Sequence, residues 1–338
     1  MLTDKRVVVT GGTGSLGQAL VRRLLEGDAG LPAEVVVFSR SEALQHDMRL
    51  SFLHRRVATD EIVYDEERHS RLHFRIGDVR DYEAVASVLG GADVVFHAAA
   101  MKQVPTCEYH PVEAIKTNVG GARNIVRAIA ELELDLEAIV GVSTDKACKP
   151  VNVMGMTKAL QERILLEAGL RCPDTRFVVA RYGNVIASRG SVVPLFDEQI
   201  ATGGPVTVTT PEMTRFLLSL DQAVDTVFEA LRAGRQGETY VPRLPAVRIE
   251  ELARALTGDR EVTIEHVGVR PGEKVHEVLV SEEEAPRTVA RGDHLAIAPL
   301  LPELRVPEPG GEPFGEREYS SADEVVPPER ILELLQTR

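Results

Sequence analysis

The tetrapeptide Ser143-Thr144-Asp145-Lys146 brings hydroxyl, carboxylate and amine groups together in one short segment. It directly follows the apolar run Ala138 to Val142, which we expect to form a buried strand of a parallel sheet. In α/β folds with such a sheet, chemistry takes place beyond the carboxyl ends of the strands. Thr144, Asp145 and Lys146 are therefore candidate catalytic residues. The alternative is a solvated surface pair of opposite charges.

A second candidate group lies on the helix that we expect from Asn152 to Ala168. Met154 and Lys158 are one turn apart and therefore share a face of that helix. A lysine at this place can hold the ribose of a nicotinamide cofactor, although an isolated lysine on a helix is more often a surface charge. The other candidate residues nearby favour the functional interpretation of Lys158.

Three glycines, Gly11, Gly14 and Gly17, follow the β-branched run 5–10 with two residues between each pair. In a dinucleotide-binding loop the first glycine allows a tight turn, the second lets the backbone approach the pyrophosphate, and the third lets helix and strand pack closely. A helical apolar stripe begins at Leu16, so the free N–H groups of a helix would face the phosphates. The alternative is an ordinary glycine-rich turn. Cofactor contacts are expected from Gly11, Thr13, Gly14, Ser15, Leu16 and Gly17.

The residues after the expected strand 34–38 bear on the choice between NADP and NAD. Ser39 and Arg40 stand where an NAD-specific enzyme often carries an acidic residue for the ribose hydroxyls. A hydroxyl and a guanidinium suit a 2′-phosphate better, so we favour NADP, while Glu42 keeps NAD possible and a plain surface charge is the alternative for Arg40. Asp78 ends the next strand, where it either meets the adenine amino group or caps a helix that starts at Tyr82.

Strand and helix patterns alternate through the first two thirds of the chain, which predicts an α/β fold. Strands are expected at 5–10, 34–38, 72–76, 93–97, 138–142 and 177–180, and helices from 16, from 111 to 132 and from 152 to 168. Residues 41–70 are charged and loosely helical. Right-handed βαβ units then give a doubly wound, parallel Rossmann sheet.

The alternation ends after Asn184, where clusters of glycine and proline begin. We expect residues 1–184 to form a dinucleotide-binding Rossmann domain. Residues 185–338 should form a smaller, mixed substrate-binding lobe and a C-terminal tail, interleaved with the first domain. The stretch 302–318 is rich in Pro, Gly and Glu and is expected to be a mobile arm, and 328–335 a short closing helix.

Composition excludes several classes of partner. The chain has 338 residues and a formal net charge of −13, so no overall positive field attracts nucleic acid. No apolar run approaches the roughly 20 residues that span a bilayer, and the first residues lack the pattern of a secretory signal. Cys107, Cys148 and Cys172 have neither disulfide density nor metal-ligand spacing. We therefore expect a cytoplasmic protein without a metal, nucleic-acid or membrane partner.

These motifs together resemble those of the UDP-N-acetylglucosamine 4,6-dehydratases, which are short, soluble members of the polysaccharide-biosynthesis branch of the extended short-chain dehydrogenases/reductases. The match extends in order up to about residue 280, and the C-terminal tail resembles the family more loosely. The matching segments are 10–17, 39–42, 77–81, 97–102, 113–118, 143–158, 181–185, 190–194, 213–216 and 270–274.

The resemblance implies a UDP-sugar substrate and an internal redox cycle. C4 of the sugar would be oxidised by hydride transfer to the cofactor, the C5 proton and the C6 hydroxyl would leave, and the hydride would return to C6. In this scheme Asp145 is the acid for the C6 hydroxyl, Lys146 is the base for C5, and Thr144 contacts the C4 oxygen. Lys146 must be neutral when it acts, so we expect burial and nearby cationic groups to lower its pKa.

One position departs from the wider family. Most short-chain dehydrogenases carry a tyrosine four residues before the lysine, whereas this chain has Met154, which cannot exchange protons. A branch of the dehydratase family also reads Asn-Val-Met-Gly at the place of Asn152 to Gly155, so Met154 alone does not indicate an inactive protein. The acceptor of the C4 hydroxyl proton stays open among Asp145, Thr144 and a water ordered by Lys158.

The resemblance also implies further contacts and leaves other functions open. A homo-oligomer is expected. A different nucleotide-sugar enzyme on this fold, such as a 4-epimerase or 5,6-dehydratase, and a cofactor-binding regulator without catalysis remain alternatives. Basic residues among the substrate contacts would form a local anion site for a diphosphate. Further cofactor contacts are expected at Val79, Ala98, Ala99 and Ala100, and substrate contacts at Lys102, Asn184, Ser191, Arg215, Arg270 and Glu273.

Overall fold

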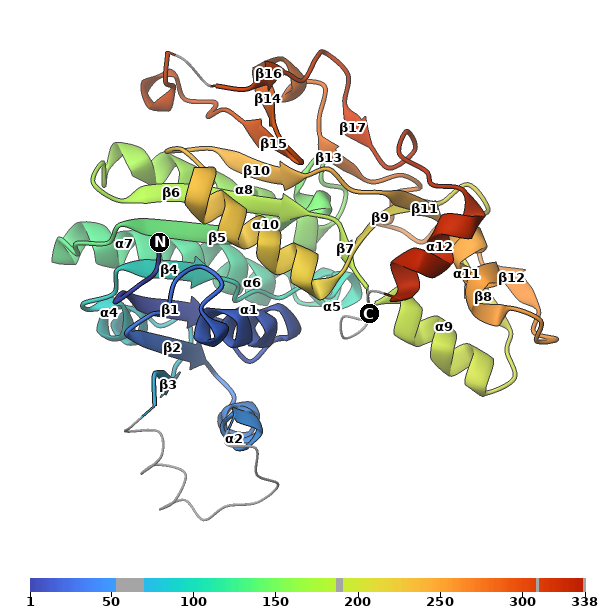
Figure 1. Cartoon of the computed structure of the whole chain (residues 1–338), viewed down its shortest axis with the longest axis horizontal. Helices are drawn as coiled ribbons and strands as arrows, with labels where there is room; N and C mark the ends of the chain where they lie inside the picture. Colours follow the sequence, from blue (N-terminus) through green and yellow to red (C-terminus); the bar gives the residue numbers. More distant parts are fainter. Residues whose placement is uncertain (53–69, 187–190, 308–309, 337–338) are drawn as a thin grey trace.

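A large, mostly parallel sheet forms the centre of the protein (Figure 1). The computed structural model describes residues 1–52, 70–186, 191–307 and 310–336. The apolar, β-branched runs predicted as strands all lie in this sheet, which confirms the α/β doubly wound fold. Its parallel strands, in spatial order, are β3 (Leu72–Ile76), β2 (Glu34–Ser39), β1 (Arg6–Thr10), β4 (Val94–His97), β5 (Ala138–Thr144), β6 (Arg176–Tyr182) and β10 (Thr239–Pro242).

Helices cover both faces of this sheet because successive strand residues point to opposite sides. Val7 and Val9 belong to the apolar core on the face of α1 (Ser15–Glu26) and α10 (Leu220–Ala233). Val8 belongs to the core on the other face, with α4 (Tyr82–Leu89), α7 (Gly120–Leu132) and α8 (Val153–Glu167). These two cores fix the carboxyl ends of the strands, where the candidate site lies.

The chain after residue 184 contributes to the central sheet as well as to a smaller lobe. Besides β10 it supplies β15 (His294–Ile297), β14 (Thr288–Arg291) and β16 (Glu312–Pro313), which extend the sheet as antiparallel strands. The sequence analysis ended the sheet one parallel strand earlier and did not foresee these additions. The domain boundary at residue 184 stays a prediction.

The smaller lobe lies beyond one end of the central sheet (Figure 1). Its core includes Phe196, Val206, Leu217, Leu252 and Ile331. The helix expected at 328–335 is confirmed as the last of its helices. The lobe is built from β7 (Asn184–Val185), β9 (Thr214–Leu218) and β11 (Ala246–Arg248), the pair β8 (Val206–Val208) and β12 (Ile264–His266), and the helices α9 (Val192–Ala201), α11 (Ile249–Thr257) and α12 (Pro328–Gln336).

The helix predicted from 111 to 132 is not continuous. It consists of α6 (Pro111–Ala114), a π-helical turn over Ile115–Val119, and α7. The wider π turn changes which residues face inward, so the apolar Ile115 is 49% exposed, whereas Thr117 and Asn118 are buried. From Ala122 onward the helix turns an apolar face to the core.

Three further local predictions concern Asp78, the arm 302–318 and the region 41–70. Asp78 does not cap the helix before Tyr82, because the side chain of Asp81 accepts the N–H groups of Glu83 and Ala84 there. Within the expected arm, β16 pairs with β14 and Phe314 packs against the core. The loosely helical region begins with α2 (Glu42–Phe52), and its residues 53–69 lie outside the described part of the chain. Among the described residues, no helix is long and apolar enough to cross a membrane.

Candidate active site

Thr144, Asp145 and Lys146 form a hydrogen-bonded group where β5 ends. The chain leaves the strand in a short 3-10 helix, Asp145–Ala147, and the Lys146 N–H of this helix donates to the Thr144 hydroxyl at 3.4 Å. Asp145 Oδ1 accepts hydrogen bonds from Thr144 Oγ1 at 2.8 Å and from Lys146 Nζ at 3.0 Å. Asp145 is fully buried, and its Oδ2 has no protein partner among the described residues. An uncompensated buried carboxylate oxygen is costly, so this atom is suited to meet a ligand.

The charges of this pair differ from the sequence-based expectation. Burial favours the neutral form of Asp145, but the Lys146 ammonium and the Thr144 hydroxyl outweigh burial, and the pKa of Asp145 is lowered. Burial also opposes the charge on Lys146, but the carboxylates of Asp145 and Glu277 outweigh it, and the pKa of Lys146 is raised. The expected lowering of the Lys146 pKa is therefore wrong. The pair is a carboxylate and an ammonium.

Glu277 is the residue of this group that sequence reasoning missed. Its carboxylate is 3.6 Å from Lys146 Nζ, 3.5 Å from Lys274 Nζ and 4.0 Å from Arg215 Nε. The matched segment 270–274 ends three residues earlier, so only the proximity of Glu277 to that segment signalled a role. The structure thus links Arg215, predicted as a substrate contact, to the candidate catalytic residue Lys146 through the carboxylate of Glu277.

Lys158 is a buried lysine with neutral hydrogen-bond partners. Its Nζ donates to the carbonyl oxygen of Val142 at 2.5 Å and to Gln161 Oε1 at 2.8 Å. Burial lowers the pKa of Lys158 to about 8, against a smaller opposing influence of Glu162. The helix approaches the turn of Asp145 and Lys146 closely because Gly155 lies against the Lys146 carbonyl, where a side chain would clash. Lys158 therefore lies on the element that packs on the candidate catalytic residues.

Met154 lies in an apolar cluster beside the candidate site. It is 4% exposed and packs with Cys107 and Ala114, with Met101 beside them. Asn118 fixes the neighbouring segment, because it accepts from the Met101 N–H at 2.8 Å and donates to the Met101 carbonyl at 3.0 Å. In this chain, the position that usually holds a tyrosine is thus occupied by an apolar side chain that serves to pack against its neighbours.

The glycine loop has the close contacts that a dinucleotide site requires. Gly11 has φ +71°, and a Cβ there would lie 2.7 Å from the Ala99 nitrogen. A Cβ on Gly17 would lie 2.5 Å from the Gly11 oxygen, so α1 and the loop touch through backbone alone. Gly14 precedes the first helical residue, Ser15, and no side chain caps that end of the helix. The N-terminus of α1 is therefore open toward phosphates. Thr13 is buried, and Ser15 and Leu16 are half-buried.

The expected adenosine contacts surround the ends of β2 and β3. Ser39 is buried, and its hydroxyl accepts a hydrogen bond from Gln45 Nε2 at 3.0 Å. The Arg40 side chain is 59% exposed, and its guanidinium is 4.0 Å from Asp78. Asp78 also pairs with Arg80, and although burial opposes its charge, that hydrogen bonding lowers the pKa of Asp78. Gln45, which sequence reasoning missed, thus holds the strand end that carries both Ser39 and Arg40.

The other residues predicted to contact the cofactor or the substrate lie at several separate places in the structure. Ala98 and Ala99 donate backbone N–H groups to Thr10, at 3.1 Å to its carbonyl and 3.4 Å to its hydroxyl. Arg215 Nη2 donates to the Lys274 carbonyl at 2.9 Å, so it lies against the loop of Arg270 and Glu273. The other positions are Ala100 (half-buried), Val79 (buried), Lys102 (exposed), Asn184 and Ser191 (half-buried, each with a buried oxygen lacking a described partner), Arg270 (exposed) and Glu273 (half-buried).

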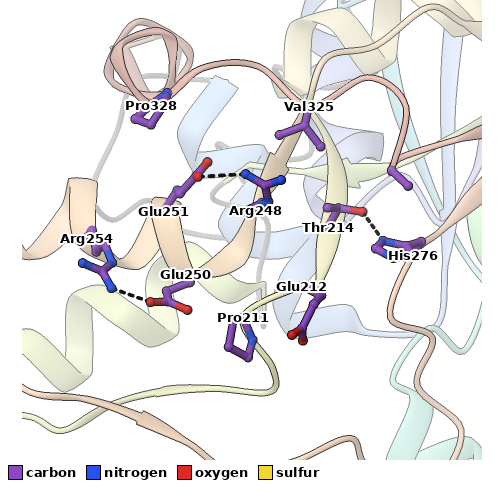
Figure 2. Close-up of a pocket in the computed structure, with 11 residues that line it drawn as sticks. Pro211, Glu212, Thr214, Arg248, Glu250, Glu251, Arg254, His276, Val325 and Pro328 are labelled. Atoms are coloured by element: carbon purple, nitrogen blue, oxygen red, sulfur yellow. Dashed lines mark hydrogen bonds and ion pairs between the residues drawn. The ribbon is translucent and has the colours of Figure 1, made fainter.

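A pocket of about 640 Å³ lies in the smaller lobe, with Thr214, Arg248 and His276 among the residues that line it (Figure 2). Thr214 and His276 in its wall directly precede Arg215 and Glu277, and they are hydrogen-bonded at 2.8 Å. Its arginines are already paired, Arg248 with Glu251 and Arg254 with Glu250. None of the predicted catalytic residues lines it.

The fold and the site define the class of protein: an extended short-chain dehydrogenase/reductase fold with a glycine-rich loop at one strand end and a carboxylate–ammonium pair at another. Residues 7–299 match the family model described as "Polysaccharide biosynthesis protein". The chain belongs to that family.

Relatives and solved structures agree with this assignment. A protein named UDP-glucose 4-epimerase from Rickettsia typhi is 44% identical over 303 residues, covering 88% of this chain and 84% of its own. The Rickettsia massiliae protein of the same name is 45% identical over 302 residues, with the same coverage of both chains. Pen from Bacillus thuringiensis has a similar structure, with a TM-score of 0.86 and 31% identity over 99% of this chain and 98% of Pen. DesIV, a dTDP-glucose 4,6-dehydratase from Streptomyces venezuelae, has a TM-score of 0.66 at 23% identity, covering 80% and 86%, and shows likeness of fold alone.

Proposed function

We propose that this protein is a nucleotide-sugar-modifying enzyme that works with a nicotinamide dinucleotide, and that its reaction is the 4,6-dehydration of UDP-N-acetylglucosamine. The observation that carries the proposal is the pair Asp145 and Lys146, a buried carboxylate 3.0 Å from an ammonium at the end of β5. Water elimination needs an acid and a base at adjoining carbons, and this pair provides both. The names of the Rickettsia relatives support a nucleotide-sugar substrate in general.

The proposed cofactor is NADP, with NAD as the alternative. The glycine loop fits either, because it leaves backbone N–H groups open at the start of α1. The exposed Arg40 guanidinium favours a 2′-phosphate, whereas the structure of DesIV contains NAD and supports the alternative. When bound, the nicotinamide supplies the acceptance and return of a hydride. Lys158 is proposed to hold its ribose.

Thr144 and Asp145 offer a route for the proton of the C4 hydroxyl that does not need a tyrosine. Thr144 Oγ1 already donates to Asp145 Oδ1 at 2.8 Å, so a substrate hydroxyl that donates to Thr144 passes its proton along this bond. Asp145 receives it as a carboxylate, consistent with its lowered pKa. Met154 has no part in this step, since it is enclosed by apolar side chains.

The same proton then serves the elimination. Protonated Asp145 is the acid that the departing C6 hydroxyl requires, so the proton lost at C4 leaves as part of the water. Protonation of Asp145 also removes one of the two negative charges beside Lys146. The pKa of Lys146 then falls, which favours release of the ammonium proton to solvent, and the neutral amine takes the C5 proton and later returns it.

A 4-epimerase is the second candidate, because the curated relatives at 44–45% identity carry that name. Epimerisation at C4 needs one group that removes and returns the C4 hydroxyl proton. It gives Lys146 no proton-transfer step, although Lys146 lies in the middle of the site. The adjacent acid and base therefore favour the dehydratase.

Product analysis separates the candidates. Purified protein is incubated with UDP-N-acetylglucosamine or UDP-glucose in deuterated solvent, with NADP or NAD, and products are examined by mass and proton spectra. A dehydratase yields a product lighter by one water, with a C6 methyl group and deuterium at C5. An epimerase yields a product of unchanged mass, inverted at C4, without deuterium on carbon. No product from either sugar nucleotide with either cofactor refutes the enzymatic proposal.

A further inference from the structure

The carboxylate of Glu277 is surrounded by cations and has no role in the proposed steps. Its side chain is 3% exposed, and Lys146, Lys274 and Arg215 all approach it within 4.0 Å. A carboxylate this deeply buried is costly unless it is paired, and these cations are its partners. Together with Asp145 they form a cluster in which three cations face two carboxylates.

The backbone of Glu277 is held firmly in place. Its N–H donates to Ser321 Oγ at 2.9 Å, and its carbonyl accepts the Ser321 N–H at 2.8 Å. Ser321 is fully buried, and its hydroxyl is hydrogen-bonded to Thr214 Oγ1 at 2.7 Å. Thr214 directly precedes Arg215 in the chain. Two segments distant in sequence, at Thr214 and Ser321, therefore fix the backbone that carries the Glu277 carboxylate to within 3.6 Å of Lys146 Nζ.

We infer that Glu277 is a positioning residue for Lys146: its fixed carboxylate holds the ammonium group between itself and Asp145 and keeps the amine protonated until Asp145 takes up a proton. The catalytic meaning of this inference rests on the proposed function, but the electrostatic relationship does not. Lys146 Nζ is 3.0 Å from Asp145 Oδ1 and 3.6 Å from Glu277 Oε1, so one carboxylate remains beside it after the other is neutralised.

Every charged group that faces Lys146 in the described structure enters this balance. Asp145 and Glu277 favour its charged form, and Arg215 opposes it. Lys274 pairs with the other carboxylate oxygen of Glu277, and its ammonium also donates to the Cys148 carbonyl at 2.6 Å. Removal of the Glu277 charge leaves Lys146 with Asp145 alone against Arg215 and burial. The amine should then lose its proton at lower pH.

The test measures Lys146 itself and needs no substrate. The full-length protein is labelled with a trace of acetic anhydride across a pH series, and acetylation of each lysine is quantified by peptide mass spectrometry. Glu277→Gln should lower the midpoint pH of Lys146 labelling by about one to three pH units. At pH values below both midpoints, Lys146 should then react about tenfold faster for each pH unit by which the midpoint falls. Lys149, paired with Glu282 and Glu318, serves as the internal reference, and its midpoint should stay unchanged.

Two further variants make the result decisive. Glu238→Gln removes another buried carboxylate, paired with Arg291, and should leave the Lys146 midpoint at its wild-type value. Glu277→Asp keeps the charge but withdraws it by one methylene, and should lower the midpoint by less than Glu277→Gln. An unchanged midpoint in folded Glu277→Gln overturns the inference, and an unchanged midpoint in Glu277→Asp does so if the Gln variant does not fold. Failure to find any sugar-nucleotide product would refute the proposed function and leave this measurement intact.

Discussion

Asn152 joins the helix of Lys158 to the loop at Gly272. Its Oδ1 accepts the Gly155 N–H at 2.8 Å and so caps α8, while its Nδ2 donates to the Gly272 carbonyl at 2.8 Å. Gly272 has φ +81°, and a Cβ there would lie 3.2 Å from the Cβ of Asn152. One side chain therefore sets the distance between the helix and the loop that carries Arg270 and Glu273.

Asn152→Asp separates these two functions of the side chain. The carboxylate keeps the helix cap and suits the helix dipole, but it cannot donate to Gly272 and repels that carbonyl. We expect a KM for the sugar nucleotide that rises about tenfold, equivalent to about 1.4 kcal/mol, with little loss of thermal stability. Asn152→Ala should lose the cap as well and unfold more easily by about 1 kcal/mol. Kinetics and thermal unfolding of both variants check this, and an unchanged KM in Asn152→Asp would contradict it.

Gly17→Ala tests the backbone contact within the dinucleotide loop. A Cβ at Gly17 would lie 2.5 Å from the Gly11 oxygen and the Gly12 Cα, neither of which can move without displacing the loop. We expect a loss of about 2 kcal/mol or more in stability and loss of dinucleotide binding. Gly14→Ala is the matched control, because its Cβ would meet only the Gly11 oxygen, at 3.3 Å. It should fold normally yet bind the dinucleotide more weakly. Thermal melts with and without NADP or NAD measure both effects.

Lys158 should give the protein a distinctive pH dependence. Its folded pKa, lowered to about 8 by burial, lies below the ordinary lysine value of 10.5, so the unfolded chain binds more protons between these values. Stability attributable to this residue therefore rises with pH in that window, by about 3 kcal/mol. The difference in unfolding free energy between wild type and Lys158→Met, from urea titrations at several pH values, isolates it from other titrating groups. A difference that does not change between about pH 8 and 10.5 would refute the lowered pKa.

The sequence predicted those parts of the structure that depend on short stretches of chain. The run Val7 to Val9 is recognisable because a parallel strand is buried on both faces, and the glycines after it have local backbone reasons. The strand β10 was missed because its pairing with β6 joins residues far apart in sequence, and its short run ends in proline. The π turn at Ile115–Val119 was missed because its apolar spacing imitates a regular helix.

In the candidate site, too, local sequence predicted the positions along the chain but not the effects of distant partners. The sequence placed Asp145 and Lys146 correctly at the end of β5. The sign of the Lys146 pKa shift depends on Glu277, which is 131 positions further along the chain and approaches only through the tertiary fold. Local sequence context cannot supply the charge of such a partner.

Arg181 is predicted to hold the strand before the catalytic turn in place. It is buried, with two hydrogen bonds to Glu162 and two to Glu284, and Glu162 also accepts from the Ser143 hydroxyl. Arg181→Met leaves two buried carboxylates without their cation and should cost about 3–5 kcal/mol of stability. Burial would raise the pKa of Glu284, but the charge of Arg181 outweighs it and holds this pKa at about 2.

This network also fixes a pH dependence. The stability that ionised Glu284 contributes in wild type is present above the ordinary glutamate pKa of 4.5 and is lost as pH falls toward 2. Arg181→Met should lack that decline, so the wild-type advantage should shrink between about pH 4.5 and 2. Urea unfolding at several acidic pH values tests this. A constant difference between the two proteins across this range would show that Arg181 does not govern the titration of Glu284.

The last prediction concerns proton transfer by Lys146. Lys146→Ala removes the amine that takes and returns the C5 proton in the proposed reaction, so dehydration should slow by about a hundredfold to ten-thousandfold. Lys149→Ala is the matched control, since that nearby lysine is exposed and pairs only with Glu282 and Glu318 in the described structure. It should leave the rate nearly unchanged. Reactions in deuterated solvent add the decisive readout, because the base that removes the C5 proton also returns a deuteron there. If Lys146→Ala dehydrates at the wild-type rate with full deuterium incorporation at C5, another residue is the base, and the ammonium between Asp145 and Glu277 serves to balance charge rather than to move a proton.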